Sequence, residues 1–440
     1  MNALPRINRY VLDDLSTAQR AAIMRRAQAD LGEVEPVVAE IVSAVRERGD
    51  RALIEYTAKF DRAELRPGDL RAGPAEFDDA EERLEPGLRG AIEMAISNIT
   101  AHHKRQLPGP GWMQELRPGV ISGERVTPIA SAGLYVPRGK GSFPSVLMML
   151  SIPAVLAGVP RVAICTPPGP DGTVDAASLV TARLCGVEEI YKVGGAQAIA
   201  AMAYGTETVA RVDKIVGPGN QYVAAARRLV YGSVDPGMPA GPSESVVLCD
   251  DAANPQVAAR ELLVEAEHGP DSAVLLVTDS LPVADAVTAI VAELVAGMPQ
   301  PRKRFCEAVL SGFGGVVVTG SLADSIMFVN DYAPEHVRVL VREPFEVLHQ
   351  IVNAGEVLLG ERTSIAFGNF VIGVNAILPT GGFARSYSCV GVDDFLKRSS
   401  FAYVSGEGAE VLGPAAAELA QYEGFPAHAQ AARHAARGTG

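Results

Sequence analysis

Two short segments of the chain bring carboxylates and imidazoles close together. Glu265 and His268 lie three positions apart in a predicted helix that ends at a Gly-Pro pair, so both side chains share one helix face. Such a pair can chelate a divalent metal ion. The alternative is a solvated helix end at which a protonated His268 is favoured by the helix dipole. A metal site would need further ligands from elsewhere in the chain.

The second segment is Glu335-His336, which lies where a loop enters a predicted strand at residues 337–341. Neighbouring side chains of a regular strand point to opposite faces. Both residues can still serve one site if the backbone next to Pro334 is irregular, which would place an imidazole base beside a carboxylate base. A solvent-exposed loop pair is the alternative.

Two glycine-containing turns, at residues 193–197 and 217–220, each follow a predicted strand and open a helix. Backbone N–H groups and the positive end of a helix can approach a phosphate closely at such a turn. The chain has no G-x-G-x-x-G motif, however, so tight turns without a ligand remain equally consistent with the pattern.

Other histidines are less informative. His102 and His103 stand beside Lys104 and Arg105 on a predicted helix, and we expect them to be solvated. His428 follows Glu423 in the C-terminal tail, where spacing alone assigns no role to it.

The elements that must position these residues change along the chain. Residues 18–107 have helical periodicity, which ends at a Pro/Gly break at residues 108–111. Short β-branched runs then alternate with Ala-rich helices, a pattern typical of βαβ units and parallel sheets. The predicted strands lie at residues 162–166, 190–193, 214–216, 246–248, 274–278, 315–318, 337–341 and 357–359.

Composition limits the possible functions. With 440 residues, 48% of them hydrophobic and 21% charged, the chain is a globular protein of several structural units and not a disordered chain or a single small binding module. A formal net charge of -13 repels a polyanion, which argues against nucleic acid as a partner.

Three prolines interrupt the most apolar stretch, residues 143–160, so no membrane span is predicted. The N-terminus has no continuous apolar segment of a secretion signal, and we therefore expect a cytoplasmic protein. The five cysteines are widely spaced with no C-x-x-C pair, which favours small core residues over disulfides or a cysteine zinc site.

Taken together, these segments resemble the histidinol dehydrogenase family over nearly the whole chain. The resemblance begins at residues 56–61 and extends to His428. The motifs that carry it are GLYVP at 133–137, VGGAQAIA at 193–200, VDKIVGPGN at 212–220, MPAGPSE at 238–244, AEHGPDS at 266–272 and PEH at 334–336.

This resemblance implies a zinc-dependent, NAD-linked enzyme of amino-acid biosynthesis. Members of the family oxidise a primary amino alcohol to the acid in two hydride transfers through a bound aldehyde, and the named reaction is L-histidinol to L-histidine. The implied fold is α/β, with two incomplete Rossmann-like domains with parallel sheets, small helical N- and C-terminal arms, and an intertwined homodimer.

The implied domains can be placed on this sequence. They are an N-terminal arm (1–30), a discontinuous first Rossmann-like domain with the metal and catalytic residues (31–132 and 245–380), a second, NAD-binding Rossmann-like domain (133–244), and a C-terminal helical arm (381–440) that contributes to the partner's site.

Carried over by motif, His336 would be the base for the alcohol proton and Glu335 would activate water. The residues implied to contact NAD are Tyr135, Gln197 and Asn220. Those implied to bind substrate are Ser243, Glu265, His268, His336, Asn369, Glu423 and His428. Those implied to bind zinc are Glu265, His268, Asn369 and His428, of which His428, like Glu423, would come from the partner subunit.

The sequence departs from the family at three of these pocket positions. The family's zinc set is Gln, His, Asp and His, whereas Glu265 and Asn369 stand at the first and third positions, a reciprocal exchange that keeps one negative charge. Ala376 stands where the family normally carries a pocket histidine. These changes favour a paralogue acting on another primary alcohol.

A sulfonated or phosphonated diol is one such substrate, and the basic residues Arg385, Lys397 and Arg398 could bind its anionic group. A non-catalytic NAD-binding homologue is a third possibility, against which the presence of Glu335 and His336 argues.

Overall fold

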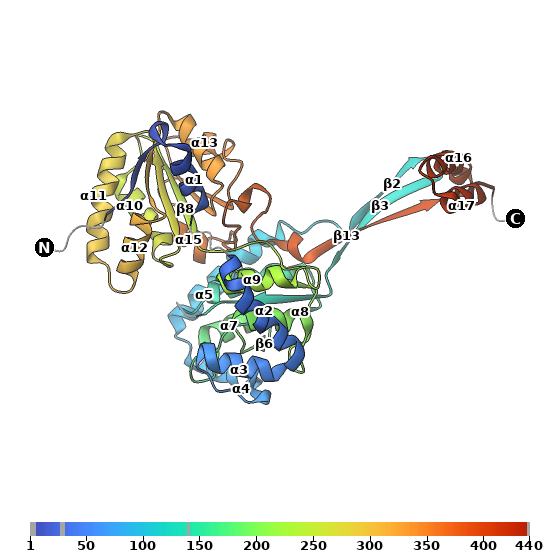
Figure 1. Ribbon diagram of the computed structural model, residues 1–440, viewed down its shortest axis with the longest axis horizontal. Helices are drawn as coiled ribbons and strands as arrows, with labels where there is room; N and C mark the ends of the chain where they lie inside the picture. Colours follow the sequence, from blue (N-terminus) through green and yellow to red (C-terminus); the bar gives the residue numbers. More distant parts are fainter. Residues whose placement is uncertain (1–5, 27–30, 139–140, 438–440) are drawn as a thin grey trace.

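The structure, a computed structural model, describes residues 6–26, 31–138 and 141–437. Its larger unit is built on a six-stranded sheet of parallel neighbours in the order β1-β10-β9-β8-β11-β12 (Figure 1). The strands are β1 (Arg9–Val11), β8 (Glu244–Cys249), β9 (Ala273–Thr278), β10 (Gly315–Val318), β11 (His336–Leu340) and β12 (Glu356–Leu359).

Helices cover both faces of this sheet, as its nearly continuous apolar strands require. Those on the first face are α10 (Pro255–Ala266), α11 (Leu281–Gly297) and α12 (Arg302–Ser311). Those on the second are α1 (Thr17–Arg25), α13 (Leu322–Tyr332) and α14 (Pro344–Leu348). Leu340 faces the first core and Val337 the second, so His336 and Arg338, at even spacing from Leu340, point toward α10.

The smaller unit has a four-stranded parallel sheet in the order β6-β5-β4-β7. Its strands are β4 (Ser131–Tyr135), β5 (Arg161–Cys165), β6 (Ile190–Tyr191) and β7 (Lys214–Val216). One face packs against α4 (Pro74–Arg83), α5 (Pro86–Lys104), α6 (Pro144–Leu156) and α7 (Ala176–Leu184). The other packs against α2 (Leu31–Arg48), α3 (Asp50–Asp61), α8 (Gly195–Tyr204) and α9 (Gln221–Val230).

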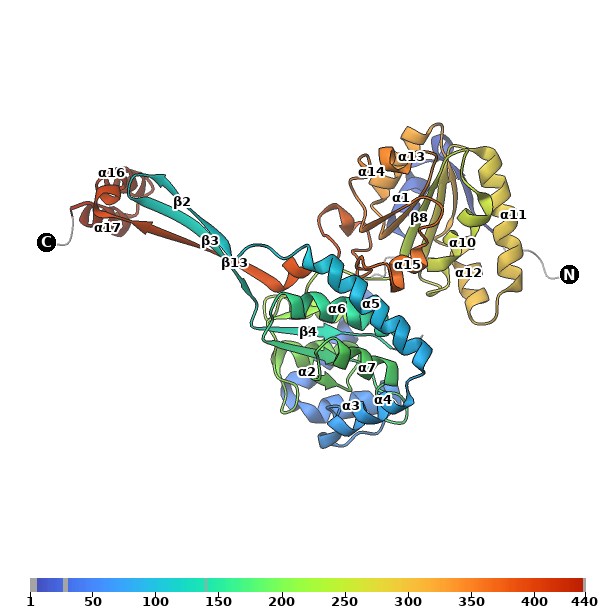
Figure 2. The same ribbon diagram turned by 180° about the vertical axis from the view of Figure 1, so that it is seen from behind.

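A long arm projects from the smaller unit (Figure 2). It is a three-stranded antiparallel sheet of β2 (Gly111–Arg117), β3 (Val120–Pro128) and β13 (Leu396–Val404). Two helices, α16 (Gly406–Tyr422) and α17 (Pro426–Arg437), pack on each other at its tip. Large apolar side chains of the arm are exposed, among them Trp112, Met113 and Tyr403.

The α/β class and all eight predicted strands are confirmed, and so is the helical character of residues 18–107. Four of the five cysteines are buried and free, as expected, and Cys389 is partly exposed. Within the described residues, no helix combines the length and the apolar character needed to cross a bilayer.

The structure differs from the expected organisation in three places. The N-terminal segment adds β1 and α1 to the larger sheet, and its residues 1–5 and 27–30 lie outside the described part. Helices of residues 31–104 pack on the smaller sheet and not on the larger one, although α5 also contacts residues 371–377. The C-terminal segment, expected to be helical, also supplies β13, because its run of residues 396–404 pairs with β3.

The prediction that His103 is solvated was wrong. This side chain is fully buried where α5 packs on α6, and burial lowers its pKa. Its Nδ1 lies 2.7 Å from Gln106 Oε1, and Asn375 Nδ2 lies 3.1 Å from its Nε2. The basic neighbours in sequence occupy the other side of the helix.

Two pairs of side chains join α10 to β11. Glu261 and Glu265 lie one turn apart on α10, and Arg338 and His336 lie two residues apart on β11. Arg338 Nε is 3.3 Å from Glu261 Oε2 in a buried ion pair, and His336 Nε2 is 3.9 Å from Glu265 Oε1. Glu261 Oε2 also accepts a hydrogen bond of 2.8 Å from the backbone N–H of Ile365, the first residue of α15 (Ile365–Phe370).

We predict that Arg338→Met lowers the free energy of unfolding by about 3–5 kcal/mol, because it leaves the Glu261 carboxylate buried without its cation. Urea denaturation followed by circular dichroism measures this change. The double variant Glu261→Leu/Arg338→Met should recover part of the loss, since no unpaired charge remains. An unchanged unfolding midpoint for Arg338→Met would show that the ion pair does not hold the two elements together.

Candidate active site

The sequence-predicted pair Glu335-His336 lies at the amino end of β11, and both side chains are buried. Glu335 Oε1 is 3.9 Å from His336 Nε2, so the irregular backbone before the strand does bring the two side chains together. Glu335 Oε2 accepts a hydrogen bond of 2.8 Å from the backbone N–H of Glu244, which opens β8. The pair is therefore held inside the larger unit and is not an exposed loop pair.

Carboxylates surround this imidazole. His336 Nδ1 lies 2.7 Å from Glu356 Oε2, while Glu335 and Glu265 lie on the side of its Nε2. Burial lowers the pKa of His336, but the hydrogen bond to Glu356 and the neighbouring carboxylates outweigh burial and raise this pKa to about 10. Burial and the charges of Glu265 and Glu244 likewise raise the pKa of Glu335 well above its usual range.

Glu265 and His268 share one face at the end of α10, as the spacing predicts. His268 Nδ1 lies 3.2 Å from Glu265 Oε2, and Asn369 Nδ2 of α15 donates a hydrogen bond of 2.8 Å to Glu265 Oε1. Glu265 is 1% exposed, and its ion pairs within the described residues are with His268 and His336. The structure thus gathers a carboxylate, an imidazole and a carboxamide next to His336.

The two tail residues are not part of this cluster. Glu423 and His428 are exposed at the tip of the arm, and both views place α17 far from α10 and α15 (Figures 1 and 2). Within the described residues of one chain, no group of three or more His, Cys, Asp or Glu side chains is arranged to hold a metal ion. A site with His428 as a ligand therefore requires a second chain.

The residues expected to contact a dinucleotide lie in the smaller unit, at the carboxyl ends of its strands. Tyr135 ends β4, and its hydroxyl oxygen accepts a hydrogen bond of 3.1 Å from the N–H of Gly195. Gln197 is 1% exposed, and its Oε1 has no hydrogen-bond partner among the described residues. Asn220 caps α9 by accepting from the N–H groups of Tyr222 and Val223, a structural role that spacing did not reveal.

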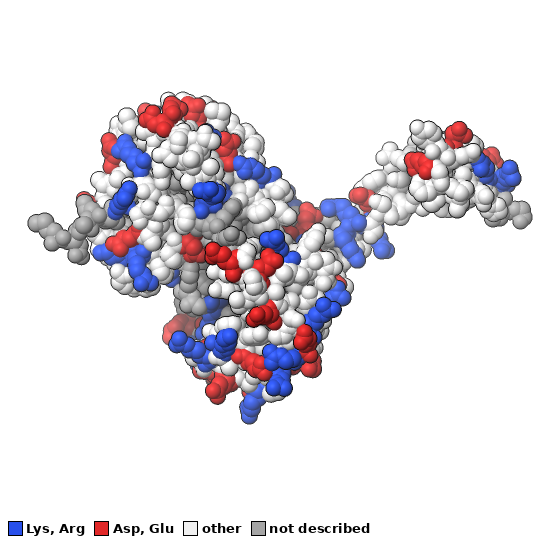
Figure 3. Space-filling view, viewed as in Figure 1, with Lys and Arg blue, Asp and Glu red and all other residues white. Residues whose placement is uncertain are grey.

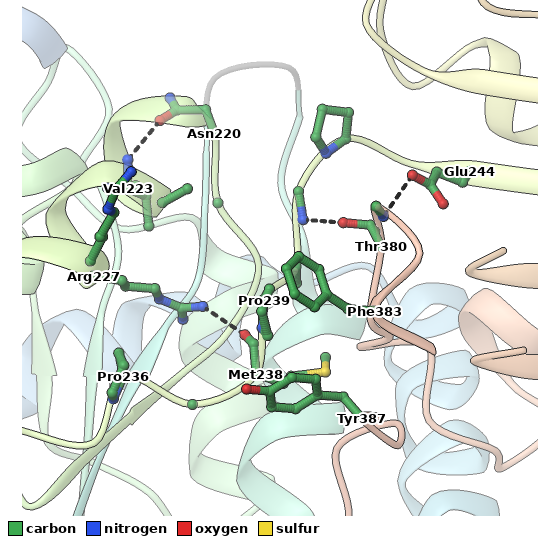
Figure 4. A pocket seen from close by; sticks show the side chains of 18 of the residues that line it. Asn220, Val223, Arg227, Pro236, Met238, Pro239, Glu244, Thr380, Phe383 and Tyr387 are labelled. Carbon is green, nitrogen blue, oxygen red and sulfur yellow. Dashed lines mark hydrogen bonds between the residues drawn. The ribbon is translucent and has the colours of Figure 1, made fainter. Parts of the chain in front are cut away.

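A cleft of about 1770 Å³ lies between the two units. Asn220 and Arg227 of the smaller unit line one wall, and Glu244 and Thr380 line the opposite wall (Figure 4). Ser243 is half-buried next to Glu244, and its carbonyl accepts from the N–H of Ala273. Glu244 connects the cleft to the catalytic pair, because it lines the cleft and its backbone N–H donates to Glu335, whereas Glu335 and His336 are not among the residues that line the cleft.

Three buried glutamates near this site were missed by the sequence reasoning: Glu244, Glu261 and Glu356. Each is the first residue of a strand or lies one helical turn before Glu265. Glu244 ends the MPAGPSE motif, which assigned it no role, and Glu261 and Glu356 belong to no short motif. The expected i, i+4 repetition on α10 could have indicated Glu261. Glu244 and Glu356 depend on the pairing of strands that are distant in sequence.

Acidic and basic side chains are interspersed over the face shown in Figure 3. For the described residues on that face, this distribution differs from the single-sign surface that attracts a polyanion. A small ligand in the cleft fits the geometry better.

Comparisons with known proteins agree with the geometry. The model of the family described as "Histidinol dehydrogenase" matches residues 24–435. A "Histidinol dehydrogenase" of Synechocystis is 49% identical over 422 residues, which cover 96% of this chain and 97% of that protein. A "Histidinol dehydrogenase homolog" of Cereibacter sphaeroides is 52% identical over 427 residues, which cover 97% of each chain.

The crystal structure of histidinol dehydrogenase from Elizabethkingia anophelis is similar over 99% of both chains, with a TM-score of 0.92 and 35% identity. The fold is thus the α/β fold of a family of oxidoreductases. This chain belongs to the histidinol dehydrogenase family, and the resemblance found in its motifs is confirmed.

Proposed function

We propose that this chain is a zinc-dependent, NAD-linked dehydrogenase that oxidises a primary alcohol to the carboxylate through a bound aldehyde, with L-histidinol to L-histidine as the named reaction. The observation that carries the proposal is the buried Glu335–His336 pair, whose imidazole faces the cluster of Glu265, His268 and Asn369. A proton acceptor thereby stands beside oxygen and nitrogen donors of the kinds that bind zinc.

The residues present fit both cofactors. Glu265, His268 and Asn369 offer a carboxylate, an imidazole and an amide, and half a turn of the last bond lets the amide present its oxygen to a cation. Gln197 Oε1 is buried without a partner near the turn at Gly195, which leaves a hydrogen-bond acceptor free for a ligand such as NAD.

When bound, zinc would polarise the substrate oxygen and NAD would accept the hydride. In the first oxidation, His336 Nε2 accepts the proton of the alcohol as the carbon loses its hydride. In the second, Glu335 takes a proton from the water that attacks the aldehyde carbon, and the hydrated aldehyde loses a second hydride. Two NADH and one carboxylate result from each alcohol molecule.

His336 must be neutral to accept that proton. The neighbouring carboxylates raise the pKa of His336 to about 10. A bound zinc ion and an oxidised nicotinamide ring would both carry positive charge, which would oppose the imidazolium and lower this pKa.

A second candidate is a paralogue that oxidises another primary alcohol, such as a sulfonated or phosphonated diol. Four relatives between 47% and 52% identical are named only as homologs of histidinol dehydrogenase. Ala376, where the family normally has a histidine, offers no polar side chain, and its N–H faces Met149 Sδ at 3.3 Å. The guanidinium groups of Arg26 and Arg385 both approach Gly382, and Arg26, which lines the cleft, is already paired with Glu244 at 3.2 Å.

The test is the number of NADH molecules formed per substrate molecule consumed, measured with zinc-loaded protein and limiting L-histidinol, with polyols and sulfonated diols in parallel. We expect two NADH per histidinol, and only a low residual rate with the His336→Asn variant. Two NADH from another alcohol and none from histidinol would instead support the paralogue. NAD binding without turnover of any alcohol would identify a non-catalytic homologue.

We predict that Glu265→Gln lowers zinc affinity roughly tenfold or more, because only neutral donors then remain from this chain. The double variant Glu265→Gln/Asn369→Asp restores one negative charge, now at position 369 of the same chain, and should recover most of the zinc affinity. Equilibrium dialysis with zinc and atomic absorption measures both. A higher affinity in Glu265→Gln would show that Glu265 is not a ligand.

Because His428 and Glu423 lie far from the cluster in their own chain, we propose that each site is completed by the arm of a second copy. Glu335→Gln and His428→Ala should each be inactive alone. An equilibrated equal mixture of the two variants should regain about a quarter of the wild-type activity, since half the dimers are mixed and one of their two sites carries no substitution. An inactive mixture whose mixed dimers are verified by two affinity tags would show that the sites are not shared.

A further inference from the structure

Glu356 faces the catalytic imidazole because of strand register. His336 and Glu356 are paired residues at the starts of the parallel strands β11 and β12, and Ser245 of β8 pairs with His336 on its other side. Side chains at paired positions of neighbouring strands point to the same face of a sheet. The backbone pairing of the sheet therefore places the carboxylate beside the ring.

The contact is specific for one ring nitrogen. Glu356 Oε2 lies 2.7 Å from His336 Nδ1, whereas Nε2 faces Glu335 and Glu265 at 3.9 Å. An ionised carboxylate only accepts hydrogen bonds, so Nδ1 must carry the proton. In the neutral ring, the free electron pair then lies on Nε2, on the side of the proposed reaction.

Glu356 has no other visible structural task. It is 8% exposed, and its second oxygen, Oε1, has no hydrogen-bond partner among the described residues. Gly368 leaves room for this carboxylate, since a Cβ at that position would stand 2.7 Å from Glu356 Oε1. Burying a carboxylate costs more free energy than a single hydrogen bond returns. The position of Glu356 therefore indicates that its contact with His336 has a functional role.

We propose that Glu356 is a positioning residue that fixes the ring orientation and the tautomer of His336, with Nδ1 protonated and Nε2 free to accept the substrate proton. In this proposal Glu356 is not the acceptor of the substrate proton. This inference rests on the proposed function, in which His336 is the base. It adds a residue to the site that touches neither substrate nor cofactor.

The kinetic test uses Glu356→Gln, with Ser245→Ala as the matched control, because Ser245 also neighbours His336 in the sheet and its hydroxyl has no hydrogen-bond partner among the described residues. We expect kcat to fall about 10- to 100-fold in Glu356→Gln, with KM and zinc content changed less than about twofold. Ser245→Ala should retain wild-type kcat. Glu356→Asp, which keeps the charge on a shorter side chain, should fall between the wild type and Glu356→Gln.

A double-variant cycle separates positioning from damage to the fold. In a His336→Asn background, Glu356→Gln should change the residual rate less than about twofold, because the group it positions is gone. An equal loss in both backgrounds, or an unchanged kcat in Glu356→Gln, would overturn the inference. If Glu356→Gln does not fold, Glu356→Asp replaces it in both backgrounds with the same criteria.

A spectroscopic measurement keeps this inference separate from the proposed function. The strongly hydrogen-bonded Nδ1–H should give a proton NMR signal downfield of the amide region that disappears in both Glu356→Gln and His336→Asn and persists in Ser245→Ala. If the wild-type protein oxidised no alcohol, the proposed function would fail. This NMR signal would even then support the contact between Glu356 and His336. Its persistence in Glu356→Gln would refute the contact whatever the enzyme oxidises.

Discussion

The site depends on the fixed distance between helix α10 and strand β11, which the buried Glu261–Arg338 ion pair sets. Glu265 lies one helical turn from Glu261, and His336 lies two residues from Arg338 on the same face of the strand. The ion pair therefore also sets the distance between Glu265 and His336. Since Glu261 also holds the N–H of Ile365, the same carboxylate locates α15 and with it Asn369. Three chain segments distant in sequence are thus aligned by one charged group that takes no part in the chemistry.

The residues implied to bind NAD and those of the catalytic pair lie at opposite ends of the strands of their two sheets. The smaller sheet offers the carboxyl ends of its strands and the N-termini of α8 and α9, where partial positive charge favours phosphate groups. The larger sheet offers the amino ends of β8, β11 and β12 and the C-terminus of α10, where partial negative charge favours cations. These helix dipoles therefore favour a dinucleotide at the smaller sheet and a metal ion at the larger sheet.

Local sequence patterns predicted a good part of this arrangement. The buried strands follow from β-branched runs, and the Glu265–His268 face follows from helical spacing, because both depend only on near neighbours. The motif resemblance pointed to Tyr135, Gln197 and Asn220, but the capping role of Asn220 depends on where α9 begins. Glu356 reaches His336 only through the register of two strands twenty residues apart, and the burial of His103 depends on how α6 packs, neither of which a local pattern encodes.

The larger sheet is assembled from both halves of the chain. Its edge strand β1 is synthesised first but pairs with β10, more than 300 residues later, whereas the sheet and the covering helices of the smaller unit lie within one run from α2 to α9. During synthesis the smaller unit can therefore form most of its core while β1 and α1 still wait for their partners, although Ile377, Val390, Val392 and Phe395 join that core later. The segment that closes the larger sheet stays unpaired until β10 is made, and the hairpin of β2 and β3 gains its third strand only when β13 follows.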